Sequence, residues 1–229
     1  MRRKILIALP IAGIVLAAAL LIPRAIFADI CPACFGLEKI APQVYLDKDS
    51  PVSPEAVLQT IDIAREQAIR YFGAFDEHPR LLICTTEACD KRLGGNGAKA
   101  MAYGSVFIRV SPEGMNSVIL AHEFSHIALH SRADPSKLPP AWFNEGLAVI
   151  VSDDPRYLKT CSGDIDLLPV SPREWNRRAG EEHSTLYHQA ACAVQGWLET
   201  HGGKDGVLAL LRGELTREEA FGPVSNPDG

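Results

Sequence analysis

The sequence has no acidic residue before Asp29, no internal repeat and no low-complexity segment. Four of its 23 basic residues lie before Asp29, so the rest of the chain has 19 basic against 28 acidic residues, a net charge of −9. Such a body lacks the basic face that contact with nucleic-acid phosphates or anionic lipids requires. We therefore expect no nucleic-acid partner.

The length and composition are those of an ordinary folded protein. A chain of 229 residues fits one globular domain with a small appendage, and 47% hydrophobic and 22% charged residues are usual proportions. We predict a membrane-anchor or signal segment over residues 1–28, a single domain over residues 29–221 and a disordered tail over residues 222–229.

The N-terminal segment consists of a basic cluster followed by a long uncharged stretch. Arg2, Arg3 and Lys4 are followed by residues 5–22, which contain no charged side chain. Eighteen such residues are the lower limit for a membrane-spanning helix and many for the core of a signal peptide. The pattern favours an uncleaved anchor that holds the body on the periplasmic or outer side of the cell membrane. The alternative is a protein secreted after cleavage near Ala28.

Six cysteines fit an exported protein, because disulfides persist in oxidising compartments. Six cysteines allow fifteen pairings, so the sequence does not fix the connectivity. The simplest proposal pairs Cys31 with Cys34, Cys84 with Cys89, and Cys161 with Cys192. Two other roles for residues 31–34 stay open, namely a redox pair, or half of a second zinc site completed by residues 84 and 89.

The central motif is His122-Glu123-Phe124-Ser125-His126, within a predicted helix over residues 116–130. Helical residues four apart share a face, so the two imidazoles can bind one ion. Glu123 lies beside that face, where its carboxylate can reach a water on the metal. Two nitrogens and a carboxylate suit zinc better than calcium or magnesium, which prefer oxygen ligands.

A catalytic zinc ion usually has three protein ligands. His130 is one turn too far along the same helix to serve as the third. Glu145 is favoured, because the 18 residues between it and His126 allow a loop and a returning antiparallel helix. Gly146 has no side chain and would let these two helices approach closely. The full set of candidates is His130, Glu145, Asp153, Asp154, His183 and His188.

Hydrophobic periodicity predicts an α+β fold, in which a small mixed sheet with an edge strand packs on a mainly helical body that contains the HExxH helix. The strand expected just before that helix offers an open edge to which a peptide can add its backbone. Residues 153–178 are expected to be mostly irregular. Strands are predicted over residues 43–46, 80–85 and 101–110, and helices over residues 54–72, 87–93, 116–130, 140–151, 184–199, 204–211 and 216–221.

The ordered motif is His122-Glu123-x-x-His126, eighteen residues, then Trp142-x-x-Glu145-Gly146-x-Ala148. It resembles the gluzincin metallopeptidases, especially their aminopeptidase-type branch and small peptidase MA-like bacterial proteins. The resemblance covers residues 101–150 and is weaker over residues 184–199. It implies a zincin-like fold, one Zn²⁺ ion held by His122, His126 and Glu145, and Glu123 as the general base that deprotonates a zinc-activated water.

The resemblance also implies a donor to the oxyanion of the reaction intermediate. Tyr187 is our candidate, with His183 and His188 as alternatives. The sequence departs from the family in two ways. It has no G-A-M-E-N exopeptidase motif. Val149 also occupies the position, four after Glu145, where an acidic residue often supports the metal ligands, so Asp153 or Asp154 would have to replace it.

Together these features predict an extracytoplasmic zinc-dependent peptidase that hydrolyses peptide bonds in peptide or protein substrates and contacts the membrane through its N-terminal segment. One alternative is a catalytically idle zinc protein that binds peptides or envelope proteins. Another is a protein in which zinc only holds helices together. Glu123 argues against both alternatives, because neither needs a general base.

Overall fold

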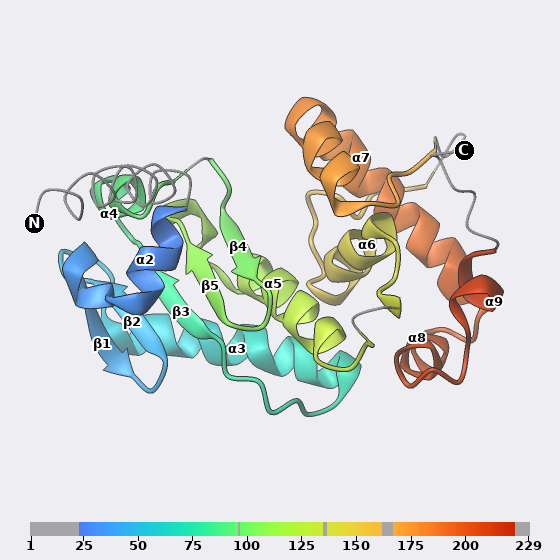
Figure 1. Ribbon diagram of the computed structural model, residues 1–229, viewed down its shortest axis with the longest axis horizontal. Helices are drawn as coiled ribbons and strands as arrows, with labels where there is room; N and C mark the ends of the chain where they lie inside the picture. Colours follow the sequence, from blue (N-terminus) through green and yellow to red (C-terminus); the bar gives the residue numbers. More distant parts are fainter. Residues whose placement is uncertain (1–22, 96, 135–136, 162–166, 223–229) are drawn as a thin grey trace, which may run out of the picture.

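A five-stranded mixed sheet forms one half of the protein (Figure 1). The computed structural model describes residues 23–95, 97–134, 137–161 and 167–222. The strand order is β1-β2-β3-β5-β4, in which β2, β3 and β5 are parallel and the two edge strands are antiparallel to their neighbours. The strands are β1 (Leu37–Ala41), β2 (Val44–Asp47), β3 (Arg80–Ile83), β4 (Ala100–Tyr103) and β5 (Phe107–Val110).

Helices cover the sheet and form the other half of the protein. Together with the mixed sheet they confirm the predicted α+β class. The helices are α2 (Arg24–Ile30), α3 (Pro54–Phe72), α4 (Glu87–Arg92), α5 (Ser117–His130), α6 (Ala141–Val151), α7 (Pro172–Thr200), α8 (Lys204–Leu211) and α9 (Arg217–Phe221), with 3-10 turns at Pro32–Phe35 and Pro112–Gly114.

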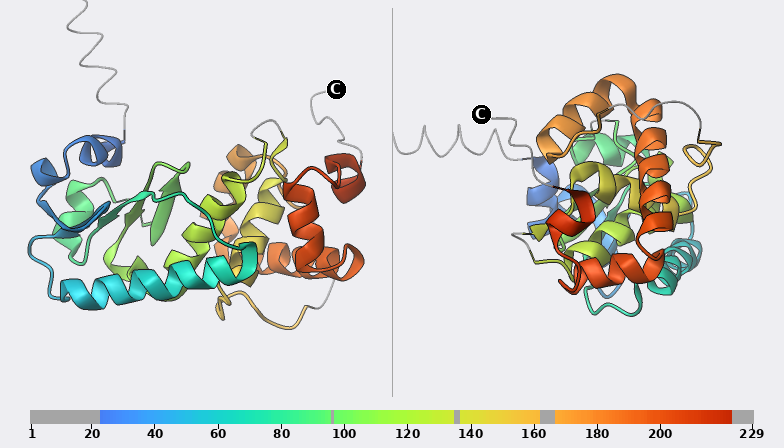
Figure 2. Two further views of the ribbon diagram at one scale, coloured as in Figure 1. Left: turned by 90° about the horizontal axis from the view of Figure 1, so that it is seen from below. Right: turned by 90° about the vertical axis from the view of Figure 1, so that its right-hand side faces the viewer.

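Each face of the sheet packs on different helices, because side chains alternate along a strand. Leu81 and Ile83 of β3 belong to the main core, which they share with α3 and α5, while Leu82 joins a smaller cluster with α2 and α4. Figure 2 shows α3 running along the outside of the main core. Helix α5 lies at the centre, and every residue from Ile119 to Leu129 is buried.

The prediction for α3 is confirmed in detail. The side chain of Ser53 accepts a hydrogen bond from the amide of Ala56, and Pro54 opens the helix. Gly73 ends the helix with φ of 82°, a conformation that glycine adopts without strain. The predicted apolar stripe is buried throughout: Val57, Ile61, Ala64, Ala68 and Phe72.

The single strand predicted over residues 101–110 is wrong as one element, because this stretch is a hairpin. Strand β4 turns at Gly104 and returns as β5, with Tyr103 opposite Phe107. The φ of 58° at Gly104 lies in the left-handed region that a tight turn requires. Strand β5 is inside the sheet, and β4, which lies at the edge, provides the predicted open edge.

Helix α7 begins earlier than predicted. Residues 172–178, which we expected to be irregular, form its first turns, and Ser171 caps them by accepting a hydrogen bond from the amide of Glu174. Glu182 has non-helical backbone angles and separates these turns from the predicted helix over residues 184–199. The prediction failed because the first turns are charged and bury only Trp175, so they have no apolar stripe.

Gly146 lies where α6 meets α7, and not where α6 meets α5 as the sequence suggested. A Cβ atom at this position would lie 2.3 Å from the carbonyl oxygen of Ala190 and 2.9 Å from Cγ2 of Val194. No side chain fits in that space, so the backbones of α6 and α7 are in direct contact. Because Glu145 is the preceding residue, this contact helps to fix its position.

The three predicted disulfides are confirmed. Their Cα–Cα distances are 5.4 Å for Cys31–Cys34, 5.3 Å for Cys84–Cys89 and 5.6 Å for Cys161–Cys192. The described residues include no free cysteine. With this pairing, the first two pairs do not form a shared zinc site.

Both predicted terminal segments extend beyond the described part of the chain. The uncharged segment over residues 5–22 lies outside it, as do residues 223–229 of the predicted tail. Within the described residues, no helix is both long enough and apolar enough to span a membrane. The two short helices predicted near the C-terminus are present as α8 and α9, and Trp197 of α7 donates a hydrogen bond to the carbonyl of Ala220 at 2.8 Å.

Candidate metal centre

Three side chains converge between α5 and α6. His122 and His126 lie one turn apart on α5, and Glu145 projects toward them from α6. Their ligand atoms all lie within 4.8 Å of one another. Oε2 of Glu145 is 3.3 Å from Nε2 of His122 and 3.6 Å from Nε2 of His126. The structure therefore brings together the three residues that the sequence proposed as ligands.

These distances fit a tetrahedral ion. Zinc bonds to nitrogen and oxygen are near 2.0–2.2 Å, which places neighbouring ligand atoms about 3.4 Å apart. The two measured nitrogen–oxygen distances are 3.3 Å and 3.6 Å, on either side of that value. The donor set of two imidazoles and one carboxylate also suits zinc. His130 is not part of the cluster, as the sequence predicted.

His126 has its second ring nitrogen fixed by a neighbour. Nδ1 of His126 lies 3.0 Å from Oδ1 of Asn144, so it donates to that oxygen. Nδ2 of Asn144 in turn lies 3.3 Å from Nε2 of His130. A proton on Nδ1 leaves Nε2 of His126 as the metal-facing nitrogen. The asparagine that orients His126 therefore directly precedes the ligand Glu145.

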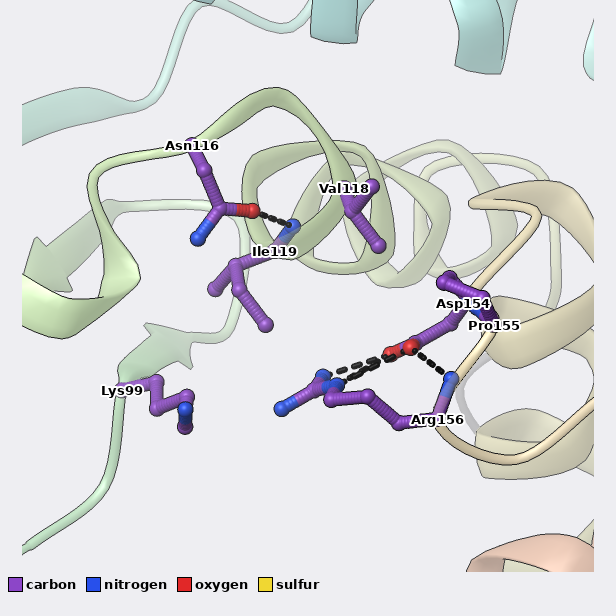
Figure 3. Close-up of a pocket in the computed structure, with 7 residues that line it drawn as sticks. All are labelled: Lys99, Asn116, Val118, Ile119, Asp154, Pro155 and Arg156. Atoms are coloured by element: carbon purple, nitrogen blue, oxygen red, sulfur yellow. Dashed lines mark hydrogen bonds and ion pairs between the residues drawn. The ribbon is translucent and has the colours of Figure 1, made fainter.

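His122 has no such partner. Its Nδ1 atom is buried and makes no hydrogen bond within the described part of the chain. Asp154 is fully buried nearby. Burial alone would raise the pKa of its carboxyl group, but the hydrogen bonds and charge of Arg156, with a smaller contribution from His122, lower it. Its carboxylate is bound by Arg156 at 2.9 Å and 3.1 Å from Nε (Figure 3). Of the two aspartates proposed to replace Val149, Asp154 is therefore the one at the site, while Asp153 is exposed.

The cluster has the electrostatics of a site that holds positive charge. Burial is the largest single influence on His126 and would lower its pKa, but the charge and hydrogen bond of Glu145, with smaller contributions from Glu123 and Asn144, together raise that pKa to about 9. Burial alone would raise the pKa of Glu145, but the charge of His126 and the hydrogen bond from His122 hold it well below its usual range. In the metal-free protein a proton on His126 thus balances the carboxylate of Glu145.

Glu123 faces the open edge of the sheet. Its Oε2 atom accepts a hydrogen bond of 2.8 Å from the backbone amide of Ala102, in β4. That amide points away from β5, because Ala102 and Ile108 form a non-hydrogen-bonded pair. The two kinds of pair alternate along the hairpin, and the pair of Lys99 and Ser111, three positions away, is hydrogen-bonded. The carboxylate next to the metal ligands is therefore held against the strand to which a peptide could be added.

Tyr187 lies beside His122, with ring centroids 6.1 Å apart. Burial raises the pKa of Tyr187 well above its usual value, and the charge of Glu145 adds to the effect. Its ring packs edge-on against the indole of Trp175, with ring centroids 5.0 Å apart. The phenol is thus neutral near pH 7 and has a proton to donate.

The two alternative donors differ from Tyr187 and from each other. Nδ1 of His188 donates to the carbonyl of Tyr157 at 2.8 Å, so this ring is held against the loop that follows α6. Nδ1 of His183 lies 3.1 Å from the hydroxyl of Tyr157, and its ring is tilted against that of Tyr187, with ring centroids 4.6 Å apart. Burial lowers the pKa of His183, and the charge of Arg156 lowers it further. His183 is therefore a neutral neighbour of the cluster.

No protein-family model, curated protein or solved structure matches this chain. The gluzincin resemblance accordingly remains a prediction based on the motif.

Sequence reasoning did not identify Asn144 and Arg156 as members of the site. Asn144 could have been found by its position, since it precedes Glu145 on the first turn of the returning helix. Arg156 left no comparable signal, because its role depends on the path of the loop after α6, which brings Asp154 back to α5.

Proposed function

We propose that this protein is a zincin-like, zinc-dependent peptidase that acts outside the cytoplasm. One observation supports this more than any other. Glu123, next to the three candidate ligands, accepts a hydrogen bond from the outward-facing amide of Ala102 in the edge strand. A carboxylate placed between a metal site and an open strand edge is what hydrolysis of an extended peptide needs.

The ligand residues would be His122, His126 and Glu145, whose distances and donor types fit zinc. A bound zinc ion would supply Lewis-acid polarisation of the scissile carbonyl and make the attacking water more acidic. Asn144 would keep Nε2 of His126 directed at the ion.

The remaining steps use the protein's own groups. The edge of β4 would bind the peptide backbone by strand addition. Glu123 would take a proton from the attacking water as the new C–O bond forms and give it to the leaving nitrogen as the C–N bond breaks. Tyr187, as a neutral phenol, would donate a hydrogen bond to the oxyanion that develops on the carbonyl.

The three disulfides support a location outside the cytoplasm. The basic cluster and uncharged segment before Pro23 support export, with a membrane anchor as our preferred form.

The test compares the zinc-loaded full chain in mild detergent with its Glu123→Gln variant. Zinc content is measured by elemental analysis, and cleavage of a diverse peptide library is measured by mass spectrometry. We expect the variant to keep zinc and to lose cleavage by about 10²- to 10⁴-fold, because only proton transfer is removed.

Cleavage that survives in Glu123→Gln would overturn the assigned general base. A zinc-loaded unaltered chain that cleaves nothing in the library would favour the catalytically idle peptide-binding protein instead. A chain that binds no zinc would overturn the proposal at its first step.

A further inference from the structure

A pocket lies between the start of β4, the first turn of α5 and the loop after α6 (Figure 3). Val118, Ile119 and Pro155 provide apolar walls, and Lys99 and Arg156 place cationic groups at it. Its cavity volume of about 190 Å³ corresponds to roughly six water molecules at about 30 Å³ each. The pocket can therefore hold one side chain of moderate size.

This pocket adjoins the candidate metal centre. Ile119 is one helical turn before His122 on α5. The charges of Lys99 and Arg156 both act on the pKa of His183, as do those of the ligands His122 and Glu145. A group bound in the pocket would therefore lie beside the helical turn that precedes His122.

Arg156 has one donor available to a ligand. Its Nε and Nη2 atoms bind the carboxylate of Asp154, which neutralises its charge. The third nitrogen, Nη1, points away from Asp154 in Figure 3 and has no hydrogen-bond partner among the residues described. Arg156 can therefore donate a hydrogen bond while adding little net charge.

Lys99 supplies the net positive charge. Two contacts fix its backbone. Its carbonyl oxygen accepts a hydrogen bond of 2.8 Å from the amide of Ser111, and it packs so closely on Gly114 that no side chain would fit at that position. Its ammonium group is 3.5 Å from the carboxylate of Glu113, and both side chains are substantially exposed. Exposed ion pairs of this kind are weak, so a ligand carboxylate can replace Glu113.

The position of the pocket defines which part of a peptide would enter it. A peptide added antiparallel to β4 runs from the Tyr103 end of the strand to the Ala100 end. Glu123 marks the cleaved bond opposite Ala102, and Lys99 lies three residues nearer the strand's start. Residues on the carboxyl-terminal side of the bond would therefore lie toward the pocket.

We propose that this pocket binds a carboxylate on the carboxyl-terminal side of the cleaved bond, with Lys99 as charge partner and Arg156 as hydrogen-bond donor. The carboxylate is either an Asp or Glu side chain or the free C-terminus of the peptide. This inference rests on the proposed peptidase function.

The first experiment measures kcat/KM of the zinc-loaded full chain on matched peptides. Each peptide has Glu or Gln at one of the first three positions after the cleaved bond, and a C-terminal acid or amide. Selection for Glu with an amidated end identifies a side-chain carboxylate, whereas selection for the free acid alone identifies the C-terminus. Equal rates on all members of the set would overturn the inference and leave the peptidase function standing.

Two variants test the charge partner. In Lys99→Gln the preference for the carboxylate should fall about five-fold, the upper range for a partly exposed ion pair. Lys91→Gln is the matched control, because Lys91 also pairs with an exposed acid, Glu87, at 3.6 Å. Lys91 lies on α4, against the opposite face of the sheet, and its variant should keep the preference. An equal loss in both variants would overturn the role of Lys99.

A third variant predicts a change in the opposite direction. Glu113→Gln removes the carboxylate that competes for Lys99, so the preference for acidic peptides should rise about two-fold. A fall in preference would contradict the proposed exchange of partners.

A binding measurement separates failure of the pocket from failure of catalysis. Fluorescence anisotropy with labelled Glu and Gln peptides gives their Kd values without turnover. Tighter binding of the Glu peptide that is lost in Lys99→Gln would support the pocket even if no peptide is cleaved. Equal Kd values for the two peptides in the unaltered chain would overturn it.

Discussion

The two ligand histidines share one helix, yet their surroundings differ. Nδ1 of His126 is bonded to Asn144, which contacts His130 in turn. Nδ1 of His122 is buried without a hydrogen bond among the described residues, and Asp154, whose carboxyl pKa is influenced by the charge of His122, is bound by Arg156. One side of the centre is therefore oriented before a metal binds, whereas the other has an acceptor nearby but no formed bond.

This difference shows how the support of each ligand depends on the chain. The hydrogen bond that orients His126 comes from Asn144, the residue before the third ligand, Glu145. One turn of α6 therefore positions both residues. The support available to His122 comes from a loop beyond α6, so it depends on packing over a longer stretch. Ligand histidines almost always use their second nitrogen, and loss of that partner typically costs 10–100-fold in metal affinity.

The largest expected effect on zinc affinity comes from removing Glu145, the candidate ligand that contacts both histidines. Glu145→Ala should lower zinc affinity by more than about 100-fold, because a ligand is lost and not only its support. His130→Ala is the control, since His130 contacts Asn144 but is outside the cluster. Competition with a chromophoric chelator measures both. A greater loss in His130→Ala would reassign the third ligand.

A smaller effect should distinguish the two sides of the centre. Asn144→Ala removes the formed hydrogen bond to His126 and should weaken zinc binding about 10- to 100-fold. Asp154→Asn keeps the size of the side chain and should cost about 10-fold or less, because no bond to His122 exists in the metal-free protein. The chelator assay, with thermal unfolding to verify folding, orders the two. The reverse order would show that the His122 side is the better supported one.

The smallest expected effect is on the number of protons released when zinc binds. Glu145 raises the pKa of His126 to about 9, so His126 is protonated at pH 7 before metal binds. This charge stabilises the metal-free fold fully below the ordinary pKa of about 6.5, and the stabilisation is lost as pH rises through about 9. Zinc binding at pH 7 should therefore release about one proton, and at pH 10 almost none. Calorimetry in two buffers of different ionisation enthalpy measures the release. Equal release at both pH values would contradict the assignment.

The elements with a regular apolar pattern were predictable from sequence. The stripe from Val57 to Phe72 gave α3 its bounds, because burial of one helix face follows a 3.6-residue period. Strand β1 was not predicted, since Glu38 and Lys39 are exposed on this edge strand and interrupt its apolar pattern. Its partner β2 was predicted, because Val44 and Leu46 are buried.

The candidate ligands were predictable because they follow local rules. His122 and His126 share a helix face by spacing, and the chain between His126 and Glu145 has the length of one loop and a returning turn. The roles of Lys99 and Arg156 were not predictable, and the sequence could not choose between Asp153 and Asp154, because these roles depend on where two loops lie relative to α5. Spacing along the sequence has no information about that distance.

The hydrogen bond between Glu123 and Ala102 has a consequence for solubility. An open strand edge presents unpaired backbone groups and is a common starting point for self-association. Strand β4 is only four residues long, and the carboxylate of Glu123 occupies one of its outward amides. A second copy of the chain that tried to pair there would first have to displace a charged group. Glu123 therefore makes edge-to-edge pairing at Ala102 less favourable, independently of any chemistry it performs.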